Sequence, residues 1–381
     1  MNKFRLKKVI GINTLFLIPG KVGGTEIFLR NLVKELAELD KYNEYLIFVN
    51  NENQKLFENL PQNFNVVHCN FNASNRLVRI IWEQLILPIQ LLFYQVDVLH
   101  SPGYTAPIFT YCKKITTIFD LNYHFHPEDF TFSQNLVYKI LIPLVAKFTD
   151  VIIVHSENSK KELSRVLNIN SKKIVVIYPG VSEYFYKKHT KKELDDFLKK
   201  YNINFPYILS SAVSHPHKNL TSLLKAYAFL VKKNEIKQKL VLLGFKGRDS
   251  QNLDKIIDEN NLNKEIIFTG WVANDKSSYI FQGADLFVFP SLYEGFGLPS
   301  IEAMASKIPL VASNYSCIPE VVGDAGLLVD AKDYKKLAGA ITKVLNAKRL
   351  RNKLITKGNK RIKIFSWRKL AIETHDLYMN V

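Results

Sequence analysis

Cysteine is scarce in this chain of 381 residues, which contains only Cys69, Cys112 and Cys317. Because the three cysteines are far apart and odd in number, the sequence predicts neither a disulfide framework nor a zinc site, and it suits a reducing compartment. The histidines have no metal-ligand spacing, and no Asp-x-Asp pair follows a strand-like run. We therefore expect no metal ligands and no essential divalent cation.

Long hydrophobic runs are also lacking. A membrane-spanning helix needs about 18 consecutive apolar residues, and the longest candidate, IIWEQLILPIQLLFY, is interrupted by polar residues and a proline. The opening MNKFRLKKVIGINTLFLIPG superficially resembles a signal peptide, but Asn13 interrupts its apolar part and no small-residue cleavage site follows. We interpret residues 9–13 as a first buried strand, and we find no short-period repeat or low-complexity tract.

The composition is that of a globular protein with an excess of positive charge. Apolar residues make up 47% of the chain, charged residues make up 23%, and the net charge is +17. A chain of this length has room for two or three domains, each with its own core. The charge excess favours an anionic partner such as nucleic acid, acidic lipid or a phosphorylated ligand.

Short apolar runs alternate with longer helical patterns in the first half of the chain. The run TEIFLRNLVKELAEL, residues 25–39, places its apolar side chains on one helical face. This alternation predicts a parallel sheet with crossover helices. The strands expected in this half are 8–12, 45–49, 97–100, 114–118, 151–154 and 173–177.

A second alternation follows a lysine-rich, polar stretch at residues 187–204. It predicts another parallel sheet with crossover helices. The strands expected there are 207–211, 239–243, 265–269, 285–289 and 309–312, and the helices are 218–233, 251–260, 276–282 and 300–306.

The simplest account is an α/β protein with two doubly wound, Rossmann-like domains in series. We assign residues 1–185 to the first domain and 186–364 to the second. An amphipathic helix at 365–381 is expected to complete the first domain. Ligands of open parallel sheets bind beyond the carboxyl ends of the strands, so the expected active site is a cleft between the two domains.

Residues 289–305, FPSLYEGFGLPSIEAMA, combine an apolar strand, a glycine loop and a helix start with proline. Backbone N–H groups at such a helix start can bind an anion, and the carboxylates of Glu294 and Glu302 can accept hydrogen bonds from vicinal hydroxyls. Phosphate and hydroxyls together describe a nucleotide sugar. Alternatively, Glu302, expected in the first helical turn, is favoured there by the helix dipole alone, and Glu294 is a solvated loop acid.

Several stretches in this order resemble the retaining family 4 glycosyltransferases, which have the GT-B fold. SLYEGFGLPSIEAMA is similar to the E-x(7)-E signature of the family, GGTE at 23–26 to the first loop of its acceptor domain, and HKNL at 217–220 to its phosphate loop. WEQLILP, DVLHSP, VHSENSKKEL, IYPGV, FTGWV and FSW also resemble family segments. The resemblance covers most of the chain and implies two Rossmann-like domains that face a central cleft.

The resemblance also assigns the residues of the reacting centre. Glu294 would contact the donor sugar, and Lys218 would neutralise the diphosphate. Asp120 is the other acid expected near the anomeric carbon. The residues implied in donor binding are Gly23, Gly24, His217, Asn219, Val272, Phe296, Gly297, Leu298 and Glu302.

Each group of donor-binding residues has an implied role. Glu302 would bind the ribose hydroxyls, and backbone N–H groups of residues 296–298 would bind the sugar or the diphosphate. The glycines of the first loop would let the first helix approach the donor phosphates, and Val272 would touch the base through its backbone. Helix dipoles and basic side chains would stabilise the leaving group, with no metal and no cofactor beyond the nucleotide-sugar substrate.

Phe119 departs from the family pattern, because a histidine usually precedes the aspartate that corresponds to Asp120. That histidine normally helps to bind the donor sugar. His124 or His126 could compensate for its loss.

Two further departures follow in the second half of the chain. The phosphate loop has Ala212 in place of the usual glycine and lacks the usual arginine, and a neutral His217 cannot replace a fixed bidentate cation. Lys307 stands where glycine is usual. Phe119 and the altered phosphate loop could each weaken donor binding or alter the choice of donor.

The sequence therefore predicts a retaining, metal-independent hexosyltransferase of bacterial surface-polysaccharide or lipopolysaccharide biosynthesis. Its donor would be a GDP-, UDP- or dTDP-linked sugar, and its acceptor a polyprenyl-diphosphate-linked, lipid-A-linked or other saccharide. Residues 76–93 and 133–148 combine apolar faces with cations, and they are either core-facing helices or a surface that docks on anionic lipid. We accordingly expect a cytoplasmic enzyme, peripheral at the inner face of the cytoplasmic membrane.

Two alternatives remain. The chain could keep this fold without transferase activity, as a sugar-nucleotide-binding subunit, an epimerase or a phosphorylase. The charge alone is also compatible with a nucleic-acid-binding protein, but no recognised motif supports that reading and the cations are dispersed rather than striped. The oligomeric state is left open.

Overall fold

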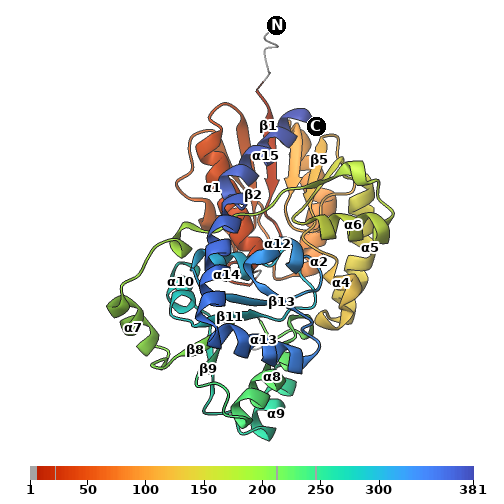
Figure 1. Ribbon diagram of the computed structural model, residues 1–381. Helices are drawn as coiled ribbons and strands as arrows, with labels where there is room; N and C mark the ends of the chain where they lie inside the picture. Colours follow the sequence, from red (N-terminus) through yellow and green to blue (C-terminus); the bar gives the residue numbers. More distant parts are fainter. Residues whose placement is uncertain (1–6, 22, 212, 245–246) are drawn as a thin grey trace. The chain divides into compact units, whose positions relative to one another are not determined.

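The computed structural model describes residues 7–21, 23–211, 213–244 and 247–381 (Figure 1). These residues form two compact units. The first contains the chain up to Leu121 together with Phe132–Gly180 and Ser366–Val381. The second contains Asn122–Thr131 and Val181–Phe365. Each unit is a parallel sheet covered by helices, which confirms the predicted α/β architecture with two doubly wound sheets.

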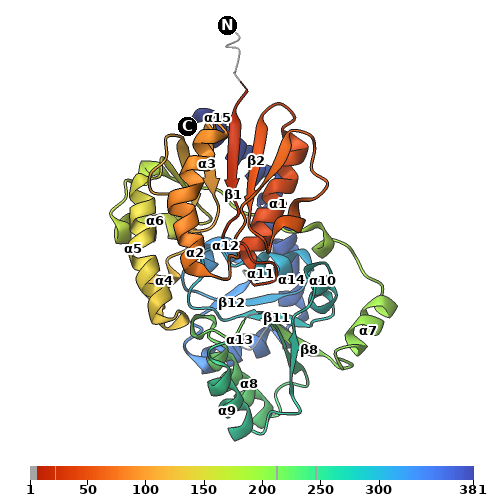
Figure 2. The same cartoon turned by 180° about the vertical axis from the view of Figure 1, so that it is seen from behind.

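The first unit is built on a seven-stranded parallel sheet in the order β3-β2-β1-β4-β5-β6-β7. Figure 2 shows its strands β1 and β2. The strand order reverses at β1, because β2 pairs with one of its edges and β4 with the other. The strands are β1 (Val9–Asn13), β2 (Glu44–Val49), β3 (Phe64–His68), β4 (Val98–Ser101), β5 (Lys113–Thr117), β6 (Val151–Val154) and β7 (Ile174–Val176).

Helices cover both faces of this sheet, so its inner strands are buried almost throughout. The α-helices are α1 (Gly24–Leu39), α2 (Arg76–Ile81), α3 (Leu87–Phe93), α5 (Phe132–Phe148), α6 (Glu157–Leu167) and α15 (Trp367–Asn380). A π-helical turn, η2 (Trp82–Ile86), joins α2 to α3. Short 3₁₀ turns are η1 (Gln54–Phe57) and η4 (Ser171–Lys173).

Helix α15 is part of the core of the first unit. The Ser366 hydroxyl caps its start by accepting a hydrogen bond from the Lys369 amide. Trp367 is 5% exposed, and Tyr378 is fully buried with its hydroxyl 2.7 Å from Nδ1 of His100 on β4. The helix also packs along α1. The prediction that a helix near the end of the chain completes the first sheet domain agrees with these contacts.

The second unit has a six-stranded parallel sheet in the order β10-β9-β8-β11-β12-β13. Its apolar strands read as continuous runs because both faces are covered. The strands are β8 (Tyr207–Ser211), β9 (Lys239–Leu243), β10 (Ile266–Gly270), β11 (Leu286–Phe289), β12 (Leu310–Ser313) and β13 (Leu327–Val329).

The helices of the second unit vary more in length than its strands. The α-helices are α4 (Asn122–Phe125), α7 (Lys191–Lys199), α8 (Leu220–Lys232), α9 (Ser250–Glu259), α10 (Asn274–Gln282), α11 (Leu298–Ala305), α12 (Ile318–Val322), α13 (Tyr334–Asn346) and α14 (Lys348–Arg361). The 3₁₀ turns are η3 (Pro127–Asp129), η5 (Glu183–Phe185), η6 (Pro216–Lys218), η7 (Gly323–Ala325) and η8 (Ile362–Ile364).

The elements differ from the sequence-based expectation in several places. No strand was expected at β3, whose side chains alternate irregularly between buried and exposed. None was expected at β13 either, a short strand of three half-buried residues. The division between units follows Gly180 rather than residue 185, and the segment Asn122–Thr131 belongs to the second unit although its neighbours in the chain belong to the first.

Candidate active site

The loop after β11 turns sharply into α11. Gly297 has φ 90°, in the left-handed region that favours glycine, and a Cβ there would lie 3.1 Å from the ring of Phe289. Helix α11 begins at Leu298, with a proline in its first turn. Phe296 is buried and packs edge-on against Phe365, with ring centroids 5.4 Å apart. Packing on both sides of Gly297 therefore fixes this helix start.

Glu302 lies further into α11 than expected. The prediction that it occupies the first turn is wrong, because the helix begins at Leu298 and its first turn contains no acidic residue. A position in the second turn weakens the explanation from the helix dipole, which acts mainly on the terminal turn. Burial raises the pKa of Glu302 from its ordinary 4.5 to about 8. The half-buried carboxylate forms no ion pair with another described residue, so its charge is stabilised only weakly there.

The structure brings together two predicted residues that are 76 positions apart. The Nζ atom of Lys218 donates a hydrogen bond to Oε1 of Glu294 at 2.7 Å. Lys218 ends the turn after β8, and Glu294 lies in the loop after β11. Because β8 and β11 are parallel neighbours, both loops leave the same edge of the sheet. The two side chains are 21% and 12% exposed, so the pair is screened less than a surface ion pair.

Two residues that sequence reasoning missed hold the backbone of Glu294. The Ser316 hydroxyl accepts a hydrogen bond from the Glu294 amide at 3.2 Å and donates one to its carbonyl at 2.9 Å. The Cys317 thiol donates to the same carbonyl at 3.1 Å. Ser316 has φ 55°, so its backbone is in a conformation that few residues other than glycine adopt. No sequence signal marked either residue, because both act from the loop after β12.

Asn219 joins the two loops of the site. It has φ 55°, and its Nδ2 atom donates to the carbonyls of Pro290 at 3.1 Å and Ala331 at 2.9 Å. Both amide protons are therefore used within the protein. The side chain ties the turn after β8 to the loop after β11, and this favours a role in shaping the site over direct binding of phosphate.

His217 is 8% exposed and is held from two sides. Its carbonyl accepts a hydrogen bond from the Leu292 amide at 2.8 Å. Its Nδ1 atom forms a hydrogen bond with Oδ2 of Asp129, which also accepts one from Nδ2 of Asn122 at 3.0 Å. Sequence reasoning missed Asp129, since nothing in the pattern joins it to the phosphate loop.

Val272 follows β10 and is 7% exposed. Gly270, the last residue of β10, has φ 66°, which turns the chain before α10 begins at Asn274. Since β8, β9, β10 and β11 are parallel, this turn leaves the same sheet edge as the loops of Lys218 and Glu294. The second unit thus collects the predicted phosphate, sugar and base residues along one edge.

The remaining predicted residues belong to the first unit. Gly23 precedes α1 with φ 56°, and Gly24 is its first residue; both are exposed. Nothing lies within 4 Å of a Cβ built on Gly23, so the need for glycine there is conformational. Asp120 is half-buried in the segment after β5. These three residues lie in a different unit from Lys218 and Glu294.

Phe119 is part of an aromatic cluster in the first unit. Its ring lies edge-on to Phe28 with centroids 5.3 Å apart, and it lies 5.2 Å from His155 and 5.5 Å from Tyr104. The phenyl ring therefore has apolar partners at the position where the family usually has histidine. The two histidines at 124 and 126 belong to the second unit, so compensation by either one stays a prediction.

The other two departures from the family pattern are Ala212 and Lys307. Ala212 lies outside the described residues. Lys307 follows the end of α11 with φ 59°, in the left-handed conformation that usually calls for glycine at a helix end. Its amide donates to the Met304 carbonyl at 3.1 Å, which helps to close the helix.

Two buried polar groups add to the candidate residues. The Ser300 hydroxyl lies in the first turn of α11 and has no hydrogen-bond partner among the described residues. In the first unit, Glu83 is 2% exposed on the π-helical turn, and its Oε1 atom accepts from Nδ2 of Asn13 at 2.7 Å. Burial raises the pKa of Glu83, and the charge of Arg79 offsets this only in part. Turns of π-helix are frequent at functional sites.

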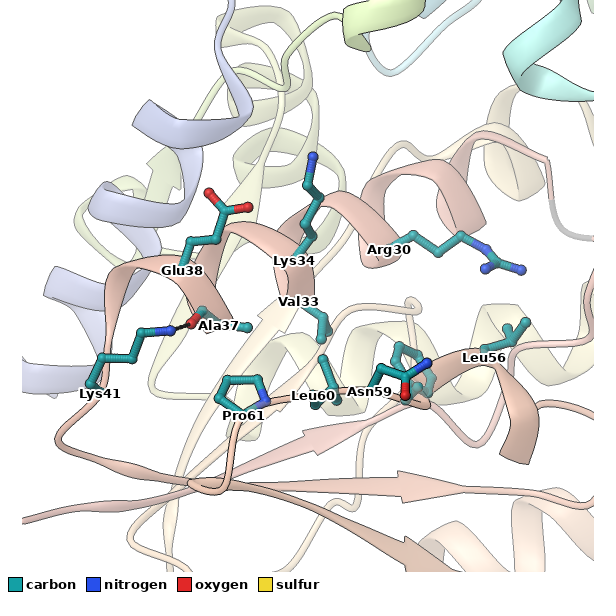
Figure 3. Close-up of a pocket in the computed structure, with 11 residues that line it drawn as sticks. Arg30, Val33, Lys34, Ala37, Glu38, Lys41, Leu56, Asn59, Leu60 and Pro61 are labelled. Atoms are coloured by element: carbon teal, nitrogen blue, oxygen red, sulfur yellow. Dashed lines mark hydrogen bonds between the residues drawn. The ribbon is translucent and has the colours of Figure 1, made fainter.

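A pocket of the first unit lies between α1 and the segment around η1 (Figure 3). Val33 and Leu60 contribute apolar side chains to it, while Arg30 and Lys41 are engaged with Glu26 and with the Ala37 carbonyl. None of the site residues predicted in this unit lines the pocket.

We searched the part of the chain that the structure describes for metal ligands and membrane-spanning helices. There, no three His, Cys, Asp or Glu side chains are grouped as ligands. Among the same residues, no helix is both long and apolar enough to cross a membrane.

Comparison with known families agrees with the fold. The model of Glycosyltransferase Family 4 matches residues 22–183, and the model of Glycosyl transferases group 1 matches residues 191–361. Together they cover most of both units. The chain belongs to the family 4, group 1 glycosyltransferases, and it has the GT-B fold.

Two related proteins and one solved structure show what this chain resembles. The O-antigen chain mannosyltransferase B of Escherichia coli is 27% identical over 365 residues, which is 91% of this chain and 93% of that protein. The N-acetylgalactosamine-N,N'-diacetylbacillosaminyl-diphospho-undecaprenol 4-alpha-N-acetylgalactosaminyltransferase of Campylobacter jejuni is 29% identical over 62% of each chain. The solved structure of Anabaena HepE in complex with UDP-glucose has a TM-score of 0.74 at 18% identity, over 97% of this chain and 99% of that one.

Proposed function

We propose that this glycosyltransferase moves a hexosyl residue from a nucleotide sugar to a lipid-linked or other saccharide acceptor during assembly of a cell-surface polysaccharide. The observation that carries this proposal is the Lys218–Glu294 pair beside the start of α11. The names of the relatives support it, because they describe transfer of mannose or N-acetylgalactosamine to surface or lipid-linked glycans.

A nucleotide sugar has the groups that this edge of the sheet can bind. The Lys218 ammonium attracts the diphosphate, and the Glu294 carboxylate accepts hydrogen bonds from sugar hydroxyls. Amides at the start of α11 add further donors for an anion. Glu302 lies in the next turn of the same helix, and its carboxylate suits the ribose hydroxyls. One ligand can thus engage three charged side chains within a single unit.

The chemistry then needs little more than positioning. The bond between the anomeric carbon and the diphosphate oxygen breaks, and its electron pair leaves with the diphosphate. An acceptor hydroxyl oxygen attacks the same face of the sugar and gives its proton to the departing diphosphate. Lys218 and the amides of α11 stabilise the charge that grows on the leaving group. This course retains the anomeric configuration and requires neither a metal ion nor a covalent intermediate on Glu294 or Asp120.

A membrane-docking surface extends the proposal to the acceptor. Four side chains from three segments of the first unit are strongly exposed although they are apolar: Leu85 (62%), Phe93 (80%), Phe109 (74%) and Phe132 (87%). The loop that contains Phe109 is tied to α3, because the Tyr111 hydroxyl donates to the Leu91 carbonyl at 2.6 Å.

The same loop contacts α5, since the rings of Phe109 and Phe148 lie 5.5 Å apart. The exposed cations Arg76, Lys139 and Lys147 belong to α2 and α5. Exposed apolar side chains with cations on the same helices suit an anionic lipid surface. We therefore place the enzyme at the inner face of the cytoplasmic membrane, where a lipid-linked acceptor would be available.

Vesicle sedimentation tests this surface. We expect binding to vesicles with 30% anionic lipid, weaker binding to zwitterionic vesicles, and a loss of roughly tenfold or more in Phe93→Ser/Phe132→Ser. Ile372→Ser removes an exposed apolar side chain of α15 and is the matched control. Equal binding of the double variant and wild type would contradict the assigned surface.

Transfer itself is tested with GDP-mannose, UDP-glucose and dTDP-rhamnose, each with and without an undecaprenyl-diphosphate-linked saccharide. Thermal shift identifies the nucleotide first, since a ligand at 100 times its Kd stabilises by about 2.7 kcal/mol. Release of nucleoside diphosphate that depends on the acceptor supports the proposal. Binding without transfer would favour the non-transferase alternative. Salt-dependent binding of DNA or RNA without any nucleotide sugar would favour the nucleic-acid-binding alternative.

A further inference from the structure

The segment Asn122–Thr131 brings a carboxylate to the phosphate loop of the second unit. The chain on both sides of this segment belongs to the first unit, yet the turn η3 contacts the turn η6 that ends at Lys218. Asp129 is 7% exposed at the end of η3. Its carboxylate therefore lies beside His217, which is 88 residues later in the chain.

We propose that Asp129 is a positioning residue of the donor site, which fixes the His217 imidazole so that its Nε2 atom binds a phosphate of the nucleotide sugar. The hydrogen bond to Asp129 occupies Nδ1 and orients the ring. Among the described residues, Nε2 has no hydrogen-bond partner. This inference rests on the proposed function, because it names the group that takes the place of the absent arginine.

The charge of the pair suits a phosphate ligand. A carboxylate at Nδ1 stabilises positive charge on an imidazole, and an imidazolium donates a hydrogen bond from Nε2 as well. Although burial acts to raise it, the hydrogen bond and charge of His217 hold the pKa of Asp129 below its ordinary range. Lys218 follows directly in the chain, so an ordered imidazolium would add a second cation to the phosphate site.

Other titratable groups surround the pair. The ring of His215 is stacked 5.9 Å from that of His217, and its Nδ1 lies 3.9 Å from Oδ1 of Asp129. Burial lowers the pKa of His215 despite this carboxylate, with smaller contributions from His217, Lys218 and Arg248.

On the other side, the ring of His126 lies 5.9 Å from His217 and 5.5 Å from that of Tyr293. Its Nδ1 atom is 3.0 Å from Oε1 of Glu128. The carboxylate of Glu128 thus engages a neighbouring histidine, whereas that of Asp129 engages His217. This difference makes Glu128 a matched control for Asp129.

The change Asp129→Asn keeps the size of the side chain but removes its charge. We expect the affinity for UDP and GDP in calorimetry to fall roughly 10- to 100-fold, as for loss of a charge-assisted hydrogen bond. His217→Gln should reproduce the loss, and the double variant should be no weaker than either single one. Glu128→Gln should leave affinity near that of wild type.

The imidazole ¹⁵N spectrum provides a readout that a merely structural role would not change. We expect the nucleotide-bound wild type to carry a proton on both ring nitrogens of His217, and Asp129→Asn to carry a proton on only one. Wild-type nucleotide affinity in folded Asp129→Asn, or additive losses in the double variant, would refute the inference. A chain that binds no nucleoside diphosphate would refute the proposed function instead, and the spectrum would still decide whether Asp129 fixes the ring.

Discussion

Replacing Glu302 by Gln should stabilise the protein at alkaline pH and weaken its binding of nucleotide. The unfolded chain releases the Glu302 proton near the ordinary pKa of 4.5, whereas burial raises the pKa of the folded carboxyl to about 8. Between these values unfolding releases a proton, so rising pH favours the unfolded state. The wild type therefore loses stability across this window, and a neutral glutamine does not.

The size of the effect follows from the two pKa values. Each pH unit within the window changes the free energy of unfolding by about 1.4 kcal/mol. Between pH 5 and pH 8 the advantage of Glu302→Gln should therefore grow by about 4 kcal/mol as an upper figure. For a unit of this size that corresponds to a rise of roughly 8–16 °C in Tm relative to wild type.

Differential scanning fluorimetry at pH 5 and pH 8 measures this difference. Glu259→Gln is the control, since Glu259 is 59% exposed in a surface pair with Lys255 and should show no such growth. In calorimetry, wild-type affinity for UDP or GDP should rise with pH up to about 8, because the ribose hydroxyls need the ionised Glu302 carboxylate as acceptor. Glu302→Gln or Glu302→Ala should bind roughly 10- to 100-fold more weakly. An equal pH response of Tm in wild type and Glu302→Gln would refute the reasoning, as would wild-type affinity in either variant.

Four further expectations concern other residues. Lys218→Ala should lower kcat/KM roughly 10- to 100-fold and raise the donor KM, because the Lys218 ammonium binds the diphosphate more strongly as it leaves. The control Lys225→Ala, at an exposed lysine, should change neither quantity. Treatment with EDTA should leave transfer intact, and complete loss that Mg²⁺ or Mn²⁺ restores would contradict the metal-free course. Lys307→Gly should raise the free energy of unfolding by roughly 0.5–1 kcal/mol, because glycine adopts the left-handed backbone conformation of this position without steric strain. Lys343→Gly, inside α13, should lower the free energy of unfolding by about 1 kcal/mol. Phe119→His should fold and retain or increase turnover, and product NMR should show a retained anomeric configuration; an inverted product would contradict the mechanism.

The sequence predicted the sheets well because their inner strands are buried on both faces. The expected ranges 151–154, 207–211 and 239–243 coincide with β6, β8 and β9. Such strands are continuous apolar runs between polar helical faces, so a local pattern is enough to find them. β3 was missed because it lies at the edge of its sheet, where Asn65 and His68 are exposed.

The candidate site was predictable only in its local parts. The glycine loop and the carboxylates of 289–305 are local signals, and the structure places Glu294 beside Lys218. The contact of Asp129 with His217 was not predictable, because it depends on a short segment joining the other unit. The second-turn position of Glu302 depends on where packing around Gly297 starts the helix, which propensity alone does not fix.

The position of α15 has a consequence for how the chain folds during synthesis. A ribosome makes the seven strands of the first sheet early, but it makes the helix that carries Trp367 and Tyr378 only after the whole second unit. Until then, the surface that Tyr378 covers near His100 stays open to water. The second unit can bury its core before the first unit receives α15. Chaperones should therefore bind nascent chains at the first unit for longer than its place at the start of the chain suggests.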